Sequence, residues 1–214
     1  MTLLLDANLV IMVLTSFLLL GSSRLATCIR IVALQGILVG ILPLTNNWNN
    51  LSLRIAMIGV VIVVLKGFVF PRLLFRAIRE SATSREVQPF VGYSASIFVG
   101  VFTLIGAFWL DSGFDLTKGQ VSGLVVPVAF FIMITGLFLM VARKTAINQV
   151  IGYLMMENGI YTFGLAIAFE IPVLVELGVL LDMFVAVFVM GIAIYRINRE
   201  FDHIDSDQLK TLKG

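Results

Sequence analysis

Long apolar runs separated by short polar breaks make up most of this sequence. Each run has about 20 to 25 residues, the length that an α-helix needs to cross the hydrocarbon core of a membrane. The longest break is the charged stretch 72–86, and the shortest is the turn at 170–172. The pattern therefore predicts an all-α integral membrane protein with seven transmembrane helices, at 3–21, 25–45, 52–71, 89–110, 121–141, 146–169 and 171–195.

The composition supports a membrane protein and excludes a water-soluble enzyme. Hydrophobic residues make up 59% of the chain and charged residues only 13%, with a mean hydropathy of +1.04. Soluble domains carry about 25% charged residues, so this chain has too few of them to cover a surface that faces water. We expect the first run to be a retained span rather than a signal peptide, because no basic residue precedes it and Asp6 lies near its start.

The positions of Lys and Arg predict the orientation of these spans. Counted by loop, twelve of the fifteen basic residues fall on one side of the membrane. Arg54 and Lys118 fall on the other side, and Lys66 falls inside a span. Basic residues are enriched in cytoplasmic loops, so the N-terminus is predicted outside and the C-terminus in the cytoplasm. The twelve are Arg24, Arg30, Arg72, Arg76, Arg79, Arg85, Arg143, Lys144, Arg196, Arg199, Lys210 and Lys213.

Cofactor chemistry has few candidate ligands here. The one cysteine, Cys28, excludes an internal disulfide and a cysteine-ligated cluster, and the one histidine, His203, lies in the polar tail. We therefore expect no catalytic residues, no metal and no bound cofactor in this chain. The net charge of +2 gives no reason to expect a nucleic-acid partner.

Ionisable residues inside the spans are the candidate functional residues, because burying a charge in a membrane costs several kcal/mol. Glu157 in the sixth predicted span and Asp182 in the seventh lie at about the same depth, ~18–20 Å from the cytoplasmic ends. Two carboxyl groups at one depth on adjacent helices could form a proton or cation relay. The alternative is a structural hydrogen bond from one protonated carboxyl to a neighbouring helix.

Lys66 and Glu176 allow two interpretations each. Lys66 lies six residues before Arg72, so its side chain could reach the cytoplasmic surface. Alternatively it is a buried lysine, or the counter-charge to a carboxylate. Glu176 lies near the outer end of its span, where it could reach the interface instead of taking part in a relay.

Three stretches resemble component E of membrane-bound hydrogenases of the hydrogenase 4 type. They are RKTAINQVIGYLMMENG at 143–159, PVLVELGVLLD at 172–182 and LKTLKG at 209–214. The resemblance extends over essentially the whole chain, and the lysine of the third span also has a counterpart in that family.

The last three spans are also similar to the K subunit of respiratory complex I and to the C subunit of multisubunit Na⁺/H⁺ antiporters. In these subunits a basic residue precedes a membrane-embedded Glu, and a second acid lies on the third helix. By position Glu157 matches the first acid and Asp182 the second, although complex I has Glu at the second place. The resemblance gives Arg143 and Lys144 a supporting role. It also divides the chain into a four-helix segment (1–112), a three-helix segment (113–198) and a cytoplasmic polar tail (199–214).

The resemblance implies a function that the residue pattern alone does not. It implies a non-catalytic membrane-arm subunit of a group 4 [NiFe]-hydrogenase in the cytoplasmic (inner) membrane, with the NiFe centre and iron–sulfur clusters in partner subunits. Other partners would be antiporter-like membrane subunits and membrane lipid. Electron transfer would be coupled to proton or sodium translocation through Glu157, Asp182, Lys66 and Glu176. The alternatives are a subunit of a Na⁺/H⁺ antiporter and a purely structural membrane anchor.

Overall fold

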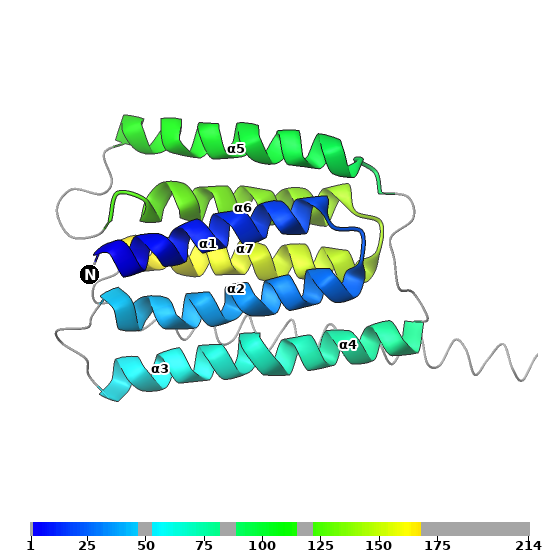
Figure 1. Cartoon of the computed structure of the whole chain (residues 1–214), viewed down its shortest axis with the longest axis horizontal. Coiled ribbons are helices and arrows are strands. Elements are labelled where there is room, and N and C mark those ends of the chain that lie inside the picture. Colours follow the sequence, from blue (N-terminus) through cyan, green and yellow to red (C-terminus); the bar gives the residue numbers. More distant parts are fainter. Residues whose placement is uncertain (1, 47–52, 82–88, 115–121, 168–214) are drawn as a thin grey trace, which may run out of the picture.

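The computed structural model describes residues 2–46, 53–81, 89–114 and 122–167, which form long helices joined by turns (Figure 1). The predicted seventh span and the tail lie outside these residues. The helices are α1 (Thr2–Gly21), α2 (Leu25–Asn46), α3 (Leu53–Val64), η2 (Leu65–Val69), α4 (Phe70–Ser81), α5 (Tyr93–Phe114), α6 (Val125–Ala142) and α7 (Ala146–Ile167).

The predicted all-helical membrane architecture is confirmed. Five of the described helices are long and apolar enough to cross a membrane. They correspond to the first five predicted spans, and the third of them runs from Ala56 to Arg79 through α3, η2 and α4. The sixth predicted span corresponds to α7, which has 22 residues, as many as α2 and α5. The count of seven and the orientation stay predictions.

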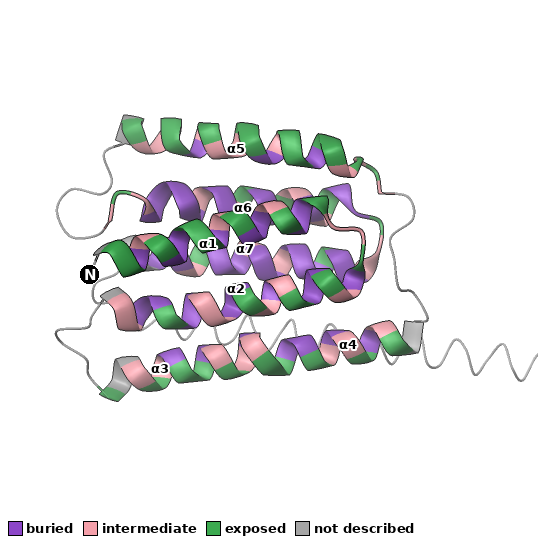
Figure 2. Ribbon diagram, viewed as in Figure 1, coloured by how far each residue is buried: buried purple, intermediate pink, exposed green. Residues whose placement is uncertain are grey.

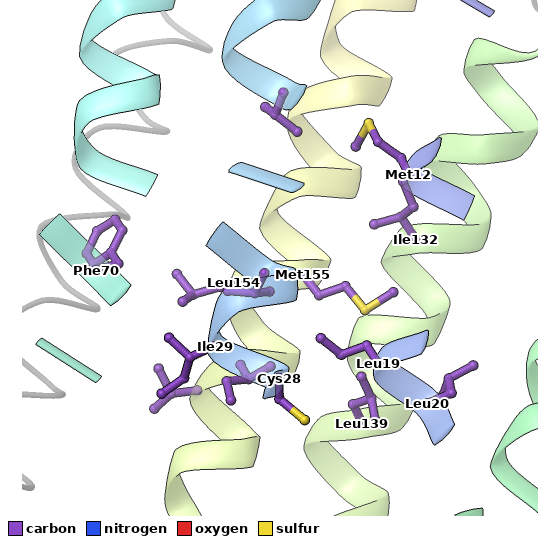
Figure 3. Close-up of a cluster of buried hydrophobic side chains, with 14 of the residues drawn as sticks. Met12, Leu19, Leu20, Cys28, Ile29, Phe70, Ile132, Leu139, Leu154 and Met155 are labelled. Carbon is purple, nitrogen blue, oxygen red and sulfur yellow. The ribbon is translucent and has the colours of Figure 1, made fainter. Parts of the chain in front are cut away.

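The helices pack as a layered bundle around α1, α2, α6 and α7 (Figure 1). α1 and α7 both lie between α2 and α6, with α3 and α4 outside α2, and α5 outside α6 and α1. Burial follows this order, because α6 and α7 are largely buried while α5 is mostly exposed (Figure 2). Apolar side chains fill the centre, including Met12 of α1, Ile132 of α6 and Met155 of α7 (Figure 3).

The packing of α6 on α7 depends on glycine. A Cβ added at Gly136 would lie 2.4 Å from the backbone nitrogen of Met156, and one at Gly152 would lie 2.8 Å from the carbonyl oxygen of Gly136. Backbones approach this closely only where neither residue carries a side chain, as in many pairs of membrane helices. These two helices are therefore in direct backbone contact near the middle of the bundle.

The third predicted span was placed too short, because the helix continues to Ser81. The sequence prediction treated Arg72, Arg76 and Arg79 as part of a loop, yet these side chains occupy the exposed side of α4. Phe70, Leu74 and Ala77 are buried on its other side. Alternation at intervals of three and four residues is typical of an amphipathic helix. The many charged residues in this stretch led to the prediction of a loop instead.

Candidate functional site

A buried ion pair joins the third helix of the bundle to α7. The Nζ atom of Lys66 lies 3.3 Å from Oε1 of Glu157. Lys66 is 6% exposed and Glu157 is 3% exposed, so both groups are shielded from solvent. Both residues also lie near the middle of their helices, far from either end. The pair is therefore placed inside the bundle, at the depth where ionisable groups are most expensive.

Asn158 is the second partner of the lysine. Nζ of Lys66 donates a hydrogen bond to Oδ1 of Asn158, at 3.2 Å. The backbone carbonyl of Asn158 accepts a hydrogen bond from the Thr162 hydroxyl at 2.8 Å, one turn further along α7. Buried charges are tolerated where they are paired and hydrogen-bonded. Consecutive residues of α7 thus supply a carboxyl and an amide oxygen to a single ammonium group.

A π-helical turn carries Lys66. Within η2 the backbone N–H of Phe70 bonds to the carbonyl of Leu65, five residues earlier. The next residue, Pro71, has no N–H to offer to the preceding turn, which favours a wider turn just before it. Such turns inside longer helices occur frequently at functional sites.

Glycine in α2 allows the lysine to lie deep in the bundle. A Cβ added at Gly36 would lie 2.5 Å from Cβ of Lys66 and 3.1 Å from its carbonyl carbon. A larger residue at this position would push α2 and η2 apart. The absence of a side chain at Gly36 therefore allows α2 and the backbone of Lys66 to pack closely together.

The arrangement can share and move a proton. An ammonium group next to a carboxylate can pass one proton to it, leaving a neutral amine and a neutral carboxyl group. In apolar surroundings the neutral and charged forms of such a pair lie closer in energy than in water, because desolvation penalises both charges.

Arg143 and Lys144 lie elsewhere, at the end of the bundle where α1 and α6 terminate. Nη2 of Arg143 donates to the Leu20 carbonyl at 2.8 Å, and Nη1 donates to the Val91 carbonyl at 3.3 Å. The guanidinium carbon also lies 4.4 Å from the centre of the Tyr93 ring. Arg143 thus joins the terminal turn of α1 to the segment that leads into α5, at a distance from Glu157 along α7.

Lys144 is exposed, and its Nζ lies 4.9 Å from the ring centre of Phe90. Of the other predicted site residues, Glu176 and Asp182 lie outside the described residues, so the predicted Glu157–Asp182 pair stays a prediction. The described residues contain no group of three or more His, Cys, Asp and Glu side chains that could hold a metal ion.

Two contributors to the site were missed in the sequence, Asn158 and Gly36. Asn158 directly follows Glu157, so a second polar residue at the middle of a predicted span was a usable signal. Gly36 gave no such signal, because glycine is frequent in membrane helices and its role depends on what packs against it.

The chain is similar in sequence to a protein of about the same length. It is 31% identical to the protein Rv0085 of Mycobacterium tuberculosis, over 94% of this chain and 92% of that protein. The chain belongs to the family of Rv0085. No solved structure matches it.

The chain also matches a family model and further relatives over part of its length. In this chain, residues 124–214 match the family model of NADH-ubiquinone/plastoquinone oxidoreductase chain 4L. Hydrogenase-4 component E from Escherichia coli is 32% identical over 99 residues, 46% of this chain and 45% of that protein. The protein of the same name from Shigella flexneri matches to the same extent. The predicted resemblance to component E and to the complex I subunit is thereby confirmed, but the match to component E covers 46% of the chain and not essentially all of it.

The match to chain 4L begins at Leu124, immediately before α6, and therefore includes Glu157 and Asn158 but not Lys66. The ion pair thus joins the segment shared with chain 4L to a helix that lies outside it.

Proposed function

We propose that this protein is a non-catalytic membrane-arm subunit of a group 4 [NiFe]-hydrogenase or a related redox complex. In this role it takes part in proton or sodium translocation that is coupled to electron transfer in partner subunits. The similarity to component E and to chain 4L supports the membrane-arm role. The buried Lys66–Glu157 pair is the observation that carries the translocation role.

The pair favours a relay over a purely structural anchor for an energetic reason. A buried ion pair is often no more stabilising than well-packed apolar residues of similar volume, so packing alone gives little reason for one. A relay requires groups whose protonation can change, and a lysine beside a glutamate has two of them. Asp182 and Glu176 are proposed as the acids that continue the route, with Glu176 contributing less because it lies near the outer end of its span.

The decisive experiment is Glu157→Gln in the assembled complex. Glutamine keeps the shape and a hydrogen-bonding oxygen for Lys66 but cannot titrate. Ion pumping in inverted vesicles should fall to background, whereas hydrogenase activity with an artificial electron donor should largely survive. Asp182→Asn should behave in the same way, and Glu176→Gln should have a milder effect.

Asp6→Asn is the matched control. Asp6 accepts a hydrogen bond from Ser122 at one end of the bundle, and asparagine preserves an accepting oxygen there. Pumping should stay normal in this variant. Normal pumping in an assembled Glu157→Gln, Asp182→Asn double variant would contradict the relay and favour the structural anchor.

The orientation is proposed to place the N-terminus outside and the C-terminus in the cytoplasm. Reporter fusions after Asn50 and after Arg79 should then report opposite sides, the first outside and the second cytoplasmic. Reporters that both indicate the cytoplasm would contradict this topology.

A further inference from the structure

A second group of buried polar side chains lies between α1 and α2, separate from the ion pair. Gln35 of α2 is fully buried, at 0% exposed. Its Nε2 atom donates toward the Ser16 hydroxyl at 2.9 Å, the Thr15 hydroxyl at 3.1 Å and the Met12 carbonyl at 3.2 Å. The amide nitrogen is therefore well supplied with acceptors on α1.

The hydrogen bonds of the two hydroxyl groups fix the orientation of this amide. The Ser16 hydroxyl donates its own proton to the Met12 carbonyl at 2.7 Å. The Thr15 hydroxyl lies 2.9 Å from the carbonyls of both Ile11 and Met12, and donates there. Because both protons are used on the α1 backbone, both hydroxyl oxygens can only accept from Gln35. The nitrogen of the carboxamide must face α1, and Oε1 points away from it.

Oε1 of Gln35 has no hydrogen-bonding partner among the residues that the structure describes, although it is buried. A buried amide oxygen without a partner costs roughly 1–3 kcal/mol, and such groups are usually satisfied by an ordered water. A second buried oxygen of the same kind is Oγ1 of Thr135 on α6, a residue that is 1% exposed.

Thr135 is buried on α6, and Gln35 is buried on α2, two helices that both pack against α1. α1 and α6 pack together and run in the same direction (Figure 1). In Figure 3, Met12 and Ile132 lie at one level of the bundle, and Leu19, Leu20 and Leu139 lie at another. Thr135 lies on the same stripe of α6 as Ile132 and Leu139, between them, and is therefore level with the middle of the α1 segment that bonds Gln35.

We propose that Gln35 and Thr135 bind an internal water molecule between α1, α2 and α6. The water donates one hydrogen bond to Oε1 of Gln35 and accepts the hydroxyl proton of Thr135. A neutral ligand fits because the groups around it are hydroxyls, a carboxamide and a backbone carbonyl, none of which would compensate a buried ion. This inference does not depend on the proposed function.

The site lies in the same layer of the bundle as the ion pair. Gly36, which directly follows Gln35 on α2, packs against Lys66 of the ion pair. The water thus lies between α1 and α2, which precede the segment matching chain 4L, and α6, which belongs to that segment.

Radiolytic hydroxyl-radical footprinting of native membranes tests the site. Radicals formed from a bound water oxidise an adjacent methionine even when bulk solvent cannot reach it, and Met12 is 0% exposed beside the cluster. Met12 should be oxidised in the wild-type protein. The oxidation should be lost in Thr135→Val and in Gln35→Leu, because each removes a partner of the water.

Thr162→Val is the matched control, since Thr162 is equally buried but its hydroxyl already bonds to the Asn158 carbonyl. Oxidation of Met12 should persist in this variant. Protection of Met12 in the wild-type protein would overturn the proposal, as would undiminished oxidation in Thr135→Val.

The melting temperature gives an independent readout in case Gln35→Leu does not fold. Thr135→Val should lower it if the hydroxyl binds water. Removing a dry, unpartnered hydroxyl should instead raise it, and that result would overturn the proposal.

Discussion

Two cations are buried in the described part of the bundle, and their surroundings differ in kind. Lys66 lies in the middle of the bundle beside the carboxyl group of Glu157. Arg143 lies at the end of α6, and its guanidinium group contacts two backbone carbonyls and the ring of Tyr93. Carbonyls and aromatic rings do not titrate, whereas a carboxyl group does.

Under the proposed function, Lys66 belongs to the relay and Arg143 does not. An arginine keeps its proton in proteins, and a lysine can release it when buried. At Arg143 a permanent cation satisfies the Leu20 carbonyl, one of the last carbonyls of α1, which no intrahelical N–H can reach. Depth and burial alone therefore do not identify a relay; the chemistry of the partner does.

The strongest test of this contrast exchanges both cations for methionine. Lys66→Met should reduce ion pumping about a hundredfold, the scale of losing a positioned proton donor or acceptor. Arg143→Met should instead weaken the fold by about 2–4 kcal/mol through the loss of two charge-assisted hydrogen bonds. Pumping per assembled complex should then stay near normal.

The readouts are pumping in vesicles and thermal unfolding of the same preparations. Full pumping in Lys66→Met, or a specific loss of pumping in a stable, assembled Arg143→Met variant, would reverse the assignment of the two cations.

A double variant separates the energetic role of the ion pair from its chemical role. Glu157→Met alone leaves the ammonium group of Lys66 without its charge partner, which should cost about 3–5 kcal/mol of stability. Lys66→Met combined with Glu157→Met should recover most of that loss, because apolar residues can replace a buried pair almost neutrally. Pumping should not return with stability, as measured on the assembled complex. Recovery of both would mean that the pair serves only the fold.

The smallest expected effect concerns the contact behind the lysine. Gly36→Ala places a methyl group against Lys66 and should destabilise the bundle by about 1–3 kcal/mol and lower pumping, because η2 must move. Gly106→Ala on α5 is the control, since a Cβ there meets nothing within 4 Å. It should leave pumping and melting temperature almost unchanged. Equal effects of the two substitutions would show that the close approach of α2 is unimportant.

Helix positions were largely predictable from the sequence, because hydrophobic runs and membrane thickness determine them. The predicted run 25–45 and α2 agree to within a residue at each end, and the predicted start at Ala146 is the start of α7. The run 89–110 was placed four residues too early at both ends relative to α5, and the largest departure was α4, whose arginines mark the exposed side of a continuing helix rather than its end. That error also made Lys66 look close to the cytoplasmic surface, whereas it lies mid-helix.

The partner of Lys66 was harder to predict from the sequence. Sequence reasoning named a carboxylate as one possible counter-charge, and it estimated the depth of Glu157. It could not select between carboxyl groups, because depth along each helix says nothing of which helices touch. That choice depends on Gly36 and on the glycines between α6 and α7, whose roles exist only once the helices are packed.

The π turn also has a geometric consequence for the side of the helix that faces inward. Buried residues recur every four positions at Ile62, Lys66, Phe70 and Leu74. In a regular α-helix each such step rotates the side chain by about 40°, so the last of them would have turned well away from the first. The extra residue in the wide turn offsets part of this rotation. Lys66 and the apolar residues before and after it therefore face about the same side of the helix. The number of residues in the turn, as well as the type of side chain, decides which residues face the interior.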